Sequence, residues 1–144
     1  IHNISLPPEN FNPSNIEKLF LNKLDFDSHE YFKEIRDLKV SSHFLIDREG
    51  HITQFVSVYK RAWHAGKSNF KNEDNCNDFS LGIELIGSDN SIFENKQYAS
   101  LKKLIKSLKK VFPKILEDNI VGHSDVAAGR KTDPGPFFDW TKIR

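Results

Sequence analysis

Several features are scarce in this sequence, and each scarcity excludes a class of protein. The chain has one cysteine, Cys76, which rules out a disulfide within the chain. No apolar run approaches the ~18 residues that a membrane-spanning helix requires, so we expect no membrane partner. Neither sign of charge dominates, because 21 basic and 20 acidic residues leave a formal net charge of +1. Nucleic-acid-binding domains usually have a pI above ~9; the pI here is about 8.0, which does not favour such a partner.

The size and the apolar content are those of one folded unit. A chain of 144 residues is expected to form a single domain, residues 1–144. Its 38% of hydrophobic residues, including 12 phenylalanines, suffice for a core without disulfides. The chain starts at Ile1 rather than at a methionine, so we expect the N-terminus to be truncated. A monomer is the expected oligomeric state.

Apolar periodicity and turn residues predict alternating strands and helices. We expect strands at 1–4, 42–47, 51–56, 79–86 and 119–122, and helices at 15–21, 29–38 and 95–112. The segment 62–77 is polar, has no clear period, and is predicted to be a long loop. Strands alternating with helices predict an α/β fold with a central mixed β-sheet flanked by helices.

A Gly/Pro-rich segment near the C-terminus contains the residues with the clearest chemistry. His123, Lys131 and Asp133 lie there, and imidazole and carboxylate are ligands that catalytic zinc sites use. A third protein ligand would leave one position open, and His2 at the other end of the chain is the candidate. If these three ligands converge, the chain is a zinc hydrolase.

Two further residues fit the same chemistry. Glu84 is the only charge in an apolar predicted strand, and a buried carboxylate is suited to move a proton between water and a leaving amine. Lys131 would stabilise the oxyanion that forms when water attacks an amide. The expected reaction is therefore amide hydrolysis.

Each of these assignments has a purely structural alternative. A histidine at a strand end is often only hydrogen-bonded, and a glutamate in an apolar strand is often a paired structural charge. Lys131 and Asp133 could form a surface ion pair worth ~1 kcal/mol or less. His43, inside a predicted strand, is expected to be a hydrogen-bonded core residue, and Cys76 a buried small residue.

Five separated blocks make the sequence similar to a known family. They are HNISLPP at 2–8, SHFLI at 42–46, KRAWHAG at 60–66, CNDFSLGIEL at 76–85, and GH followed by RKTDPGPFFDW at 122–140. Together they resemble the AmpD-type N-acetylmuramoyl-L-alanine amidases, in order, over the whole chain. The resemblance implies the fold of type-2 amidases and peptidoglycan-recognition proteins.

The resemblance also implies a specific activity. Family members use Zn²⁺ to cut the bond between the N-acetylmuramoyl group and L-alanine, and the AmpD branch recycles 1,6-anhydro-muropeptides in the cytoplasm. The zinc ligands would be His2, His123 and Asp133, and the catalytic residues Glu84 and Lys131. Positions near the substrate groove fall on Asn3, Lys39, Trp63, His64 and Ala127.

Two alternatives to this activity stay open from the sequence. One is a broader envelope amidase of the same family that acts on intact peptidoglycan. The other is a recognition module that binds muropeptides without cutting them. Such modules usually lack a zinc ligand or the catalytic partner, whereas all five of these residues are present here.

Overall fold

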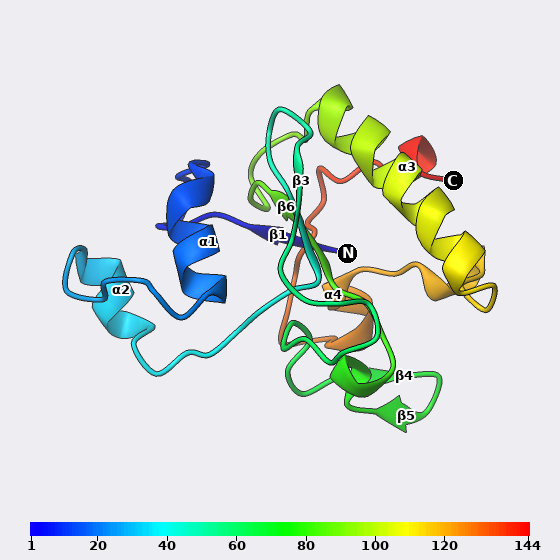
Figure 1. The fold of residues 1–144 in the computed structure, drawn as a ribbon, viewed down its shortest axis with the longest axis horizontal. Coiled ribbons are helices and arrows are strands. Elements are labelled where there is room, and N and C mark those ends of the chain that lie inside the picture. Colours follow the sequence, from blue (N-terminus) through cyan, green and yellow to red (C-terminus); the bar gives the residue numbers. More distant parts are fainter.

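A four-stranded sheet lies at the centre of the structure, a computed structural model that describes residues 1–144 (Figure 1). The strands are ordered β1 (His2–Ile4), β6 (Ile83–Ile86), β2 (Phe44–Ile46) and β3 (Ile52–Gln54). β1 and β2 both run parallel to β6, and β3 runs antiparallel to β2. The mixed sheet expected from the sequence is therefore confirmed.

Helices cover both faces of this sheet. Figure 1 shows α1 (Pro13–Phe20) and α2 (Glu30–Glu34) on one side of the strands and α3 (Asn95–Val111) on the other. Asn12 caps α1 by accepting a hydrogen bond from the backbone N–H of Ser14. None of the helices combines the length and the apolar character that crossing a bilayer requires.

Alternation along the strands divides the core into two parts. Ile46 and Leu85 point toward α3 and belong to a cluster of 11 buried residues. Leu45 and Ile86 point the other way and join a cluster of 8 buried residues that includes the apolar face of α1. The predicted apolar face of α3 is buried as expected at Tyr98, Leu101, Ile105 and Leu108. His43 and Cys76 are buried, as predicted.

Two predicted elements, the strand at 119–122 and the helix at 29–38, differ from the structure. Residues 119–122 form no strand: a 3₁₀ turn, η2 (Glu117–Asn119), precedes an extended stretch. That stretch still lies beside β1, because the amino group of Ile1 donates to the carbonyl of Val121 at 2.7 Å. The second helix, α2, is shorter than the predicted 29–38, with His29 as its N-cap.

The predicted loop 62–77 contains a small hairpin. β4 (Asn69–Phe70) pairs with β5 (Glu73–Asp74), and η1 (Cys76–Asp78) follows. Lys71 and Asn72, between the strands, both have positive φ, which is typical of a tight two-residue hairpin turn. Glycine usually marks such turns, and its absence here explains why the sequence pattern does not predict the hairpin.

Candidate metal centre and adjoining cleft

Strand register delivers two of the predicted site residues to the same place. His2 of β1 is paired with Glu84 of β6, and Glu84 is paired with Leu45 of β2. Paired residues of neighbouring parallel strands project from the same face of the sheet. Leu45 packs against the cluster around α1, so His2 and Glu84 project from that face as well.

The other two ligand candidates, His123 and Asp133, come from the C-terminal part of the chain, which lies beside β1. His123 is the first residue of the short helix α4 (His123–Val126), and its backbone N–H donates to the carbonyl of Ile1 at 3.0 Å. The carbonyl of Asp133 accepts a hydrogen bond from the N–H of Ser124 at 2.9 Å. These contacts bring His123 and Asp133 next to the strand that carries His2.

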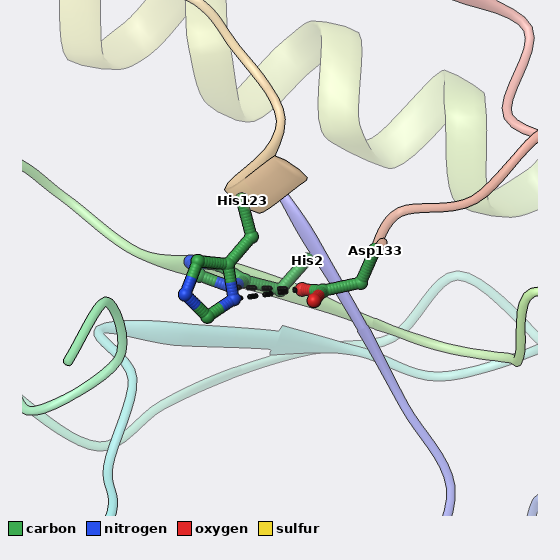
Figure 2. Close-up of side chains that lie close together, drawn as sticks. All are labelled: His2, His123 and Asp133. Carbon is green, nitrogen blue, oxygen red and sulfur yellow. Dashed lines mark hydrogen bonds and ion pairs between the residues drawn. The ribbon is translucent and has the colours of Figure 1, made fainter. Parts of the chain in front are cut away.

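The three side chains converge on one point, as Figure 2 shows. The two Nδ1 atoms of His2 and His123 are 3.0 Å apart, and each lies 3.1 Å from Oδ2 of Asp133. A tetrahedral site with bonds of ~2.0–2.1 Å has ligand atoms ~3.3 Å apart, close to these separations. Two imidazole nitrogens and one carboxylate oxygen therefore form a candidate metal site with room for a fourth ligand.

The outer nitrogens of both histidines also have partners. His123 Nε2 donates to the carbonyl of Ala65 at 2.9 Å, because a carbonyl can only accept. His2 Nε2 lies 3.0 Å from Nδ1 of His64. A proton on each Nε2 leaves each Nδ1 with a free lone pair, and this is the tautomer that a metal ligand at Nδ1 requires.

Burial and mutual contacts put these groups in the protonation states that metal binding needs. Burial lowers the pKa of His2 to about 3, although a hydrogen bond to Asp133 opposes the change. Burial alone would raise the pKa of Asp133, but the close contacts of its carboxylate with His123 and His2 outweigh burial and hold that pKa below its usual range. The imidazole of His2 is therefore neutral and the carboxylate ionised at neutral pH.

The pKa of Glu84 is shifted in the opposite direction to that of Asp133. Burial raises its pKa well above the usual value, and the nearby charge of Asp133 adds to the increase. The positive charges of the Ile1 amino group and, to a smaller extent, of Lys131 lower the pKa of Glu84 in part. A carboxyl group with a raised pKa is a stronger base than an exposed carboxylate, which suits a proton carrier beside a metal site.

A cleft of about 180 Å³ opens at this centre. Glu84, Lys131, Asp133 and Trp63 line it on the polar side, and Trp63 is 52% exposed there. Apolar residues from α1 and the region of α2 also line it: Leu19, Phe20, Tyr31, Ile35, Leu38 and Val40. The sequence pattern did not identify this apolar lining, because its members read only as helix-core positions.

A second cavity, of about 560 Å³, lies behind the histidines. His2, His64 and His123 border it, but Glu84, Lys131 and Asp133 do not. The smaller cleft alone combines the candidate ligands with a carboxyl group and a lysine, so we assign the chemistry to the smaller cleft.

Only some of the residues predicted to contact substrate lie in the cleft. Asn3, Trp63 and His64 line the cleft, whereas Lys39 and Ala127 do not. The side-chain amide of Asn3 donates to Asp89 at 2.7 Å and to the carbonyl of Pro134 at 3.1 Å. Both contacts tie Asn3 to its surroundings, and the substrate-binding roles of the five residues stay predictions.

The fold and the chemistry of this cleft are those of an amide hydrolase. The chain belongs to the N-acetylmuramoyl-L-alanine amidase family, whose sequence pattern matches residues 14–136. His123 and Asp133 fall inside the matched region, and His2 precedes it.

Individual relatives support this membership over nearly the full chain. The 1,6-anhydro-N-acetylmuramyl-L-alanine amidase AmpD of Haemophilus influenzae is 51% identical, and the alignment covers 99% of this chain and 77% of that protein. The crystal structure of a selenomethionine AmpD derivative superposes with a TM-score of 0.96 at 46% identity, covering 99% of this chain and 79% of that one.

A more distant structure was determined with a substrate. The N-acetylmuramyl-L-alanine amidase AmiD of Escherichia coli, in complex with anhydro-N-acetylmuramic acid-L-Ala-D-γ-Glu-L-Lys, has a TM-score of 0.68 and 35% identity. The alignment covers 83% of this chain and 51% of AmiD.

Proposed function

We propose that this protein hydrolyses the amide bond between N-acetylmuramic acid and L-alanine in 1,6-anhydro-muropeptides, with one zinc ion held by His2, His123 and Asp133. The observation that carries the proposal is the convergence of these three side chains beside Glu84 and Lys131 in one cleft. The name and 51% identity of the Haemophilus relative support the choice of substrate.

The proposed chemistry divides the reaction among a few groups. Zinc, when bound, supplies a Lewis acid for the amide carbonyl and for the attacking water. Glu84 takes a proton from that water as the new carbon–oxygen bond forms, and passes it to the amine nitrogen as the carbon–nitrogen bond breaks. Lys131 stabilises the negative charge that develops on the carbonyl oxygen.

The shape of the cleft supports a substrate with both sugar and peptide parts. Trp63 presents an exposed ring, which suits contact with a sugar or a lactyl methyl group. The lining around Leu38 is apolar and suits the methyl side chain of L-alanine. Asn3 and Trp63 line the cleft and are the substrate-contacting residues of this proposal, whereas Lys39 and Ala127 do not line it.

The proposal also includes a biological role and a molecular form. The protein would act in cell-wall recycling in the cytoplasm, as a single-domain monomer. The AmpD name of the relatives supports the recycling role. The similarity to AmiD favours a second candidate, an envelope amidase that also accepts intact peptidoglycan.

The test is a mass-spectrometric assay on zinc-loaded protein. 1,6-Anhydro-N-acetylmuramyl-L-Ala-D-Glu-diaminopimelate and intact peptidoglycan would be incubated in parallel, each with and without a chelator. Release of free tripeptide from the soluble fragment alone, abolished by the chelator, supports the recycling amidase. Release from both substrates favours the envelope amidase. Binding without cleavage would reject the enzymatic proposal in favour of a recognition module.

A further inference from the structure

The ring of His64 lies directly behind the candidate metal ligand His2. Nδ1 of His64 is 3.0 Å from Nε2 of His2, and the two rings meet edge to face with centroids 5.1 Å apart. The remaining ring nitrogen of His64, Nε2, is buried without a hydrogen-bond partner. Neither nitrogen of His64 is therefore presented to the cleft.

The backbone around His64 is held in place by a buried amide. The side-chain oxygen of Asn77 accepts the N–H groups of His64 and Ala65 at 3.0 and 2.8 Å. The carbonyl of Ala65 accepts from His123 Nε2, and also from Arg130 Nη2 at 2.6 Å. Two consecutive residues, His64 and Ala65, thus contact the outer nitrogens of both candidate histidine ligands.

Proton positions follow from these contacts. If His2 presents Nδ1 to a metal, its proton is on Nε2, and that N–H points at His64 Nδ1. His64 then accepts through Nδ1 and carries its own proton on Nε2. A partner on the outer nitrogen of a histidine ligand fixes both the tautomer and the angle of the ring.

The His64 ring packs directly against the backbone of Gly82. A Cβ atom at Gly82 would lie 2.3 Å from Cγ of His64, far inside contact distance. Gly82 has no positive φ, so the backbone itself does not require glycine there. The space that the missing side chain leaves is filled by the His64 ring.

We propose that His64 is a positioning residue for the metal centre: its Nδ1 accepts the Nε2 proton of His2 and so turns His2 Nδ1 toward the metal. This inference rests on the proposed metal site. It gives His64 the role of orienting His2 rather than the role of binding substrate. Asn77 and Arg130 hold the segment 63–66 that carries this contact. The sequence pattern did not single out either of these two residues.

Two substitutions at His64 test separately the hydrogen-bond acceptor at Nδ1 and the volume of the ring. Asn places its side-chain oxygen close to where Nδ1 lies, so His64→Asn keeps the acceptor and loses ring volume. His64→Phe keeps a ring and loses the acceptor. Zinc affinity of the full chain would be measured by competition with a chromophoric chelator, and the stability of the metal-free protein by urea unfolding.

We expect His64→Phe to weaken zinc binding by about 10–100-fold, the usual effect of losing such an outer partner, and His64→Asn to weaken it far less. Gly82→Ala, which displaces the ring without removing a polar group, should resemble His64→Phe. If affinity follows ring volume instead, or if all three variants bind zinc like the unmodified protein, the positioning role is wrong.

A second readout distinguishes positioning from substrate contact. At saturating zinc, His64→Phe should lower kcat more than it raises KM, and ¹⁵N NMR should show the Nε2–H of His2 losing its hydrogen bond. A raised KM with unaltered zinc affinity would overturn the assignment in favour of substrate binding. Failure of the unmodified protein to bind zinc would instead refute the proposed function itself.

Discussion

His2 and Glu84 are direct partners in adjacent parallel strands, and Nδ1 of His2 lies 4.0 Å from Oε1 of Glu84. The separation is too long for a hydrogen bond. Glu84 is therefore near the candidate metal site but makes no hydrogen bond to His2. Its side chain is 10% exposed, on the wall of the cleft. The pairing of β1 with β6 therefore sets the distance between the candidate metal ligand His2 and the proposed proton carrier Glu84.

Replacing Glu84 with glutamine should separate turnover from metal binding. Gln preserves the shape of the side chain but cannot take up a proton, so we expect zinc to be retained and turnover to fall by about 10²–10⁴-fold. Metal content by plasma mass spectrometry and tripeptide release would be measured on the same samples. Unchanged turnover would remove Glu84 from the mechanism.

The same variant should be more stable than the unmodified protein when metal is absent. The pKa of Glu84 is raised in the folded state, so folding stability is lost as pH rises from the unfolded pKa of 4.5 toward the folded value. Glu84→Gln removes that loss. Urea unfolding with a chelator should show a larger gain at pH 8 than at pH 5, and an equal gain at both would contradict the pKa direction.

Asp133→Asn should release or greatly weaken zinc. The amide has the size of the carboxylate but lacks the charge that balances the metal, and it leaves the contacts to His2 and His123 without an anion. We expect a loss of affinity beyond the ~10–100-fold typical of an outer partner. Asp118→Asn, at an exposed position, is the matched control. Tight retention of zinc by Asp133→Asn would exclude a ligand role.

Much of the fold could be predicted because its signals are local. The face of α3 follows from the spacing of Tyr98, Leu101 and Ile105, and β6 follows from an apolar run. The hairpin at 69–74 has no glycine at its turn, and the extended stretch near Val121 depends on Ile1, 120 residues away. Contacts of that kind leave no pattern in the nearby sequence.

The candidate site was also predictable only in part. Residue type alone pointed to His2, His123 and Asp133, because few side chains can hold zinc. The partners behind them were not predictable, since His64 meets His2 across 62 residues and Ala65 acts through its backbone carbonyl. The apolar lining at Leu38 was also missed, because an apolar residue near a helix ordinarily belongs to the core.

Lys131→Ala should reduce catalysis and leave the metal in place. Loss of one donor to a developing oxyanion typically costs about 2.7–4 kcal/mol of barrier, which corresponds to roughly 10²–10³-fold in kcat. Lys102→Ala, on the exposed side of α3, is the control for loss of a positive charge. Steady-state kinetics and zinc content decide the role. Loss of zinc from Lys131→Ala, or full activity, would place Lys131 in a different role.

The contribution of His2 to the stability of the metal-free protein should decrease as the pH falls from about 6.5. His2 has a pKa of about 3 when folded and 6.5 as a free side chain, so between these values the unfolded state binds a proton that the folded state does not. Burial also lowers the pKa of His64, which adds to the loss in the same direction. The contribution of the two histidines is therefore fully present above pH 6.5 and declines toward pH 3, whereas the contribution of Glu84 changes in the opposite direction.

Substitution of His2 isolates its share of this pH dependence. His2→Gln, which cannot gain a proton, should flatten the fall in unfolding free energy between pH 6.5 and 4.5, above the range in which Asp133 titrates. His29→Asn is the matched control, because His29 is exposed and asparagine can still cap α2. Urea unfolding in chelator at half-unit pH steps would give both slopes. An unchanged slope in His2→Gln would mean that folding does not lower the pKa of His2, which would contradict the burial of its imidazole in a neutral form.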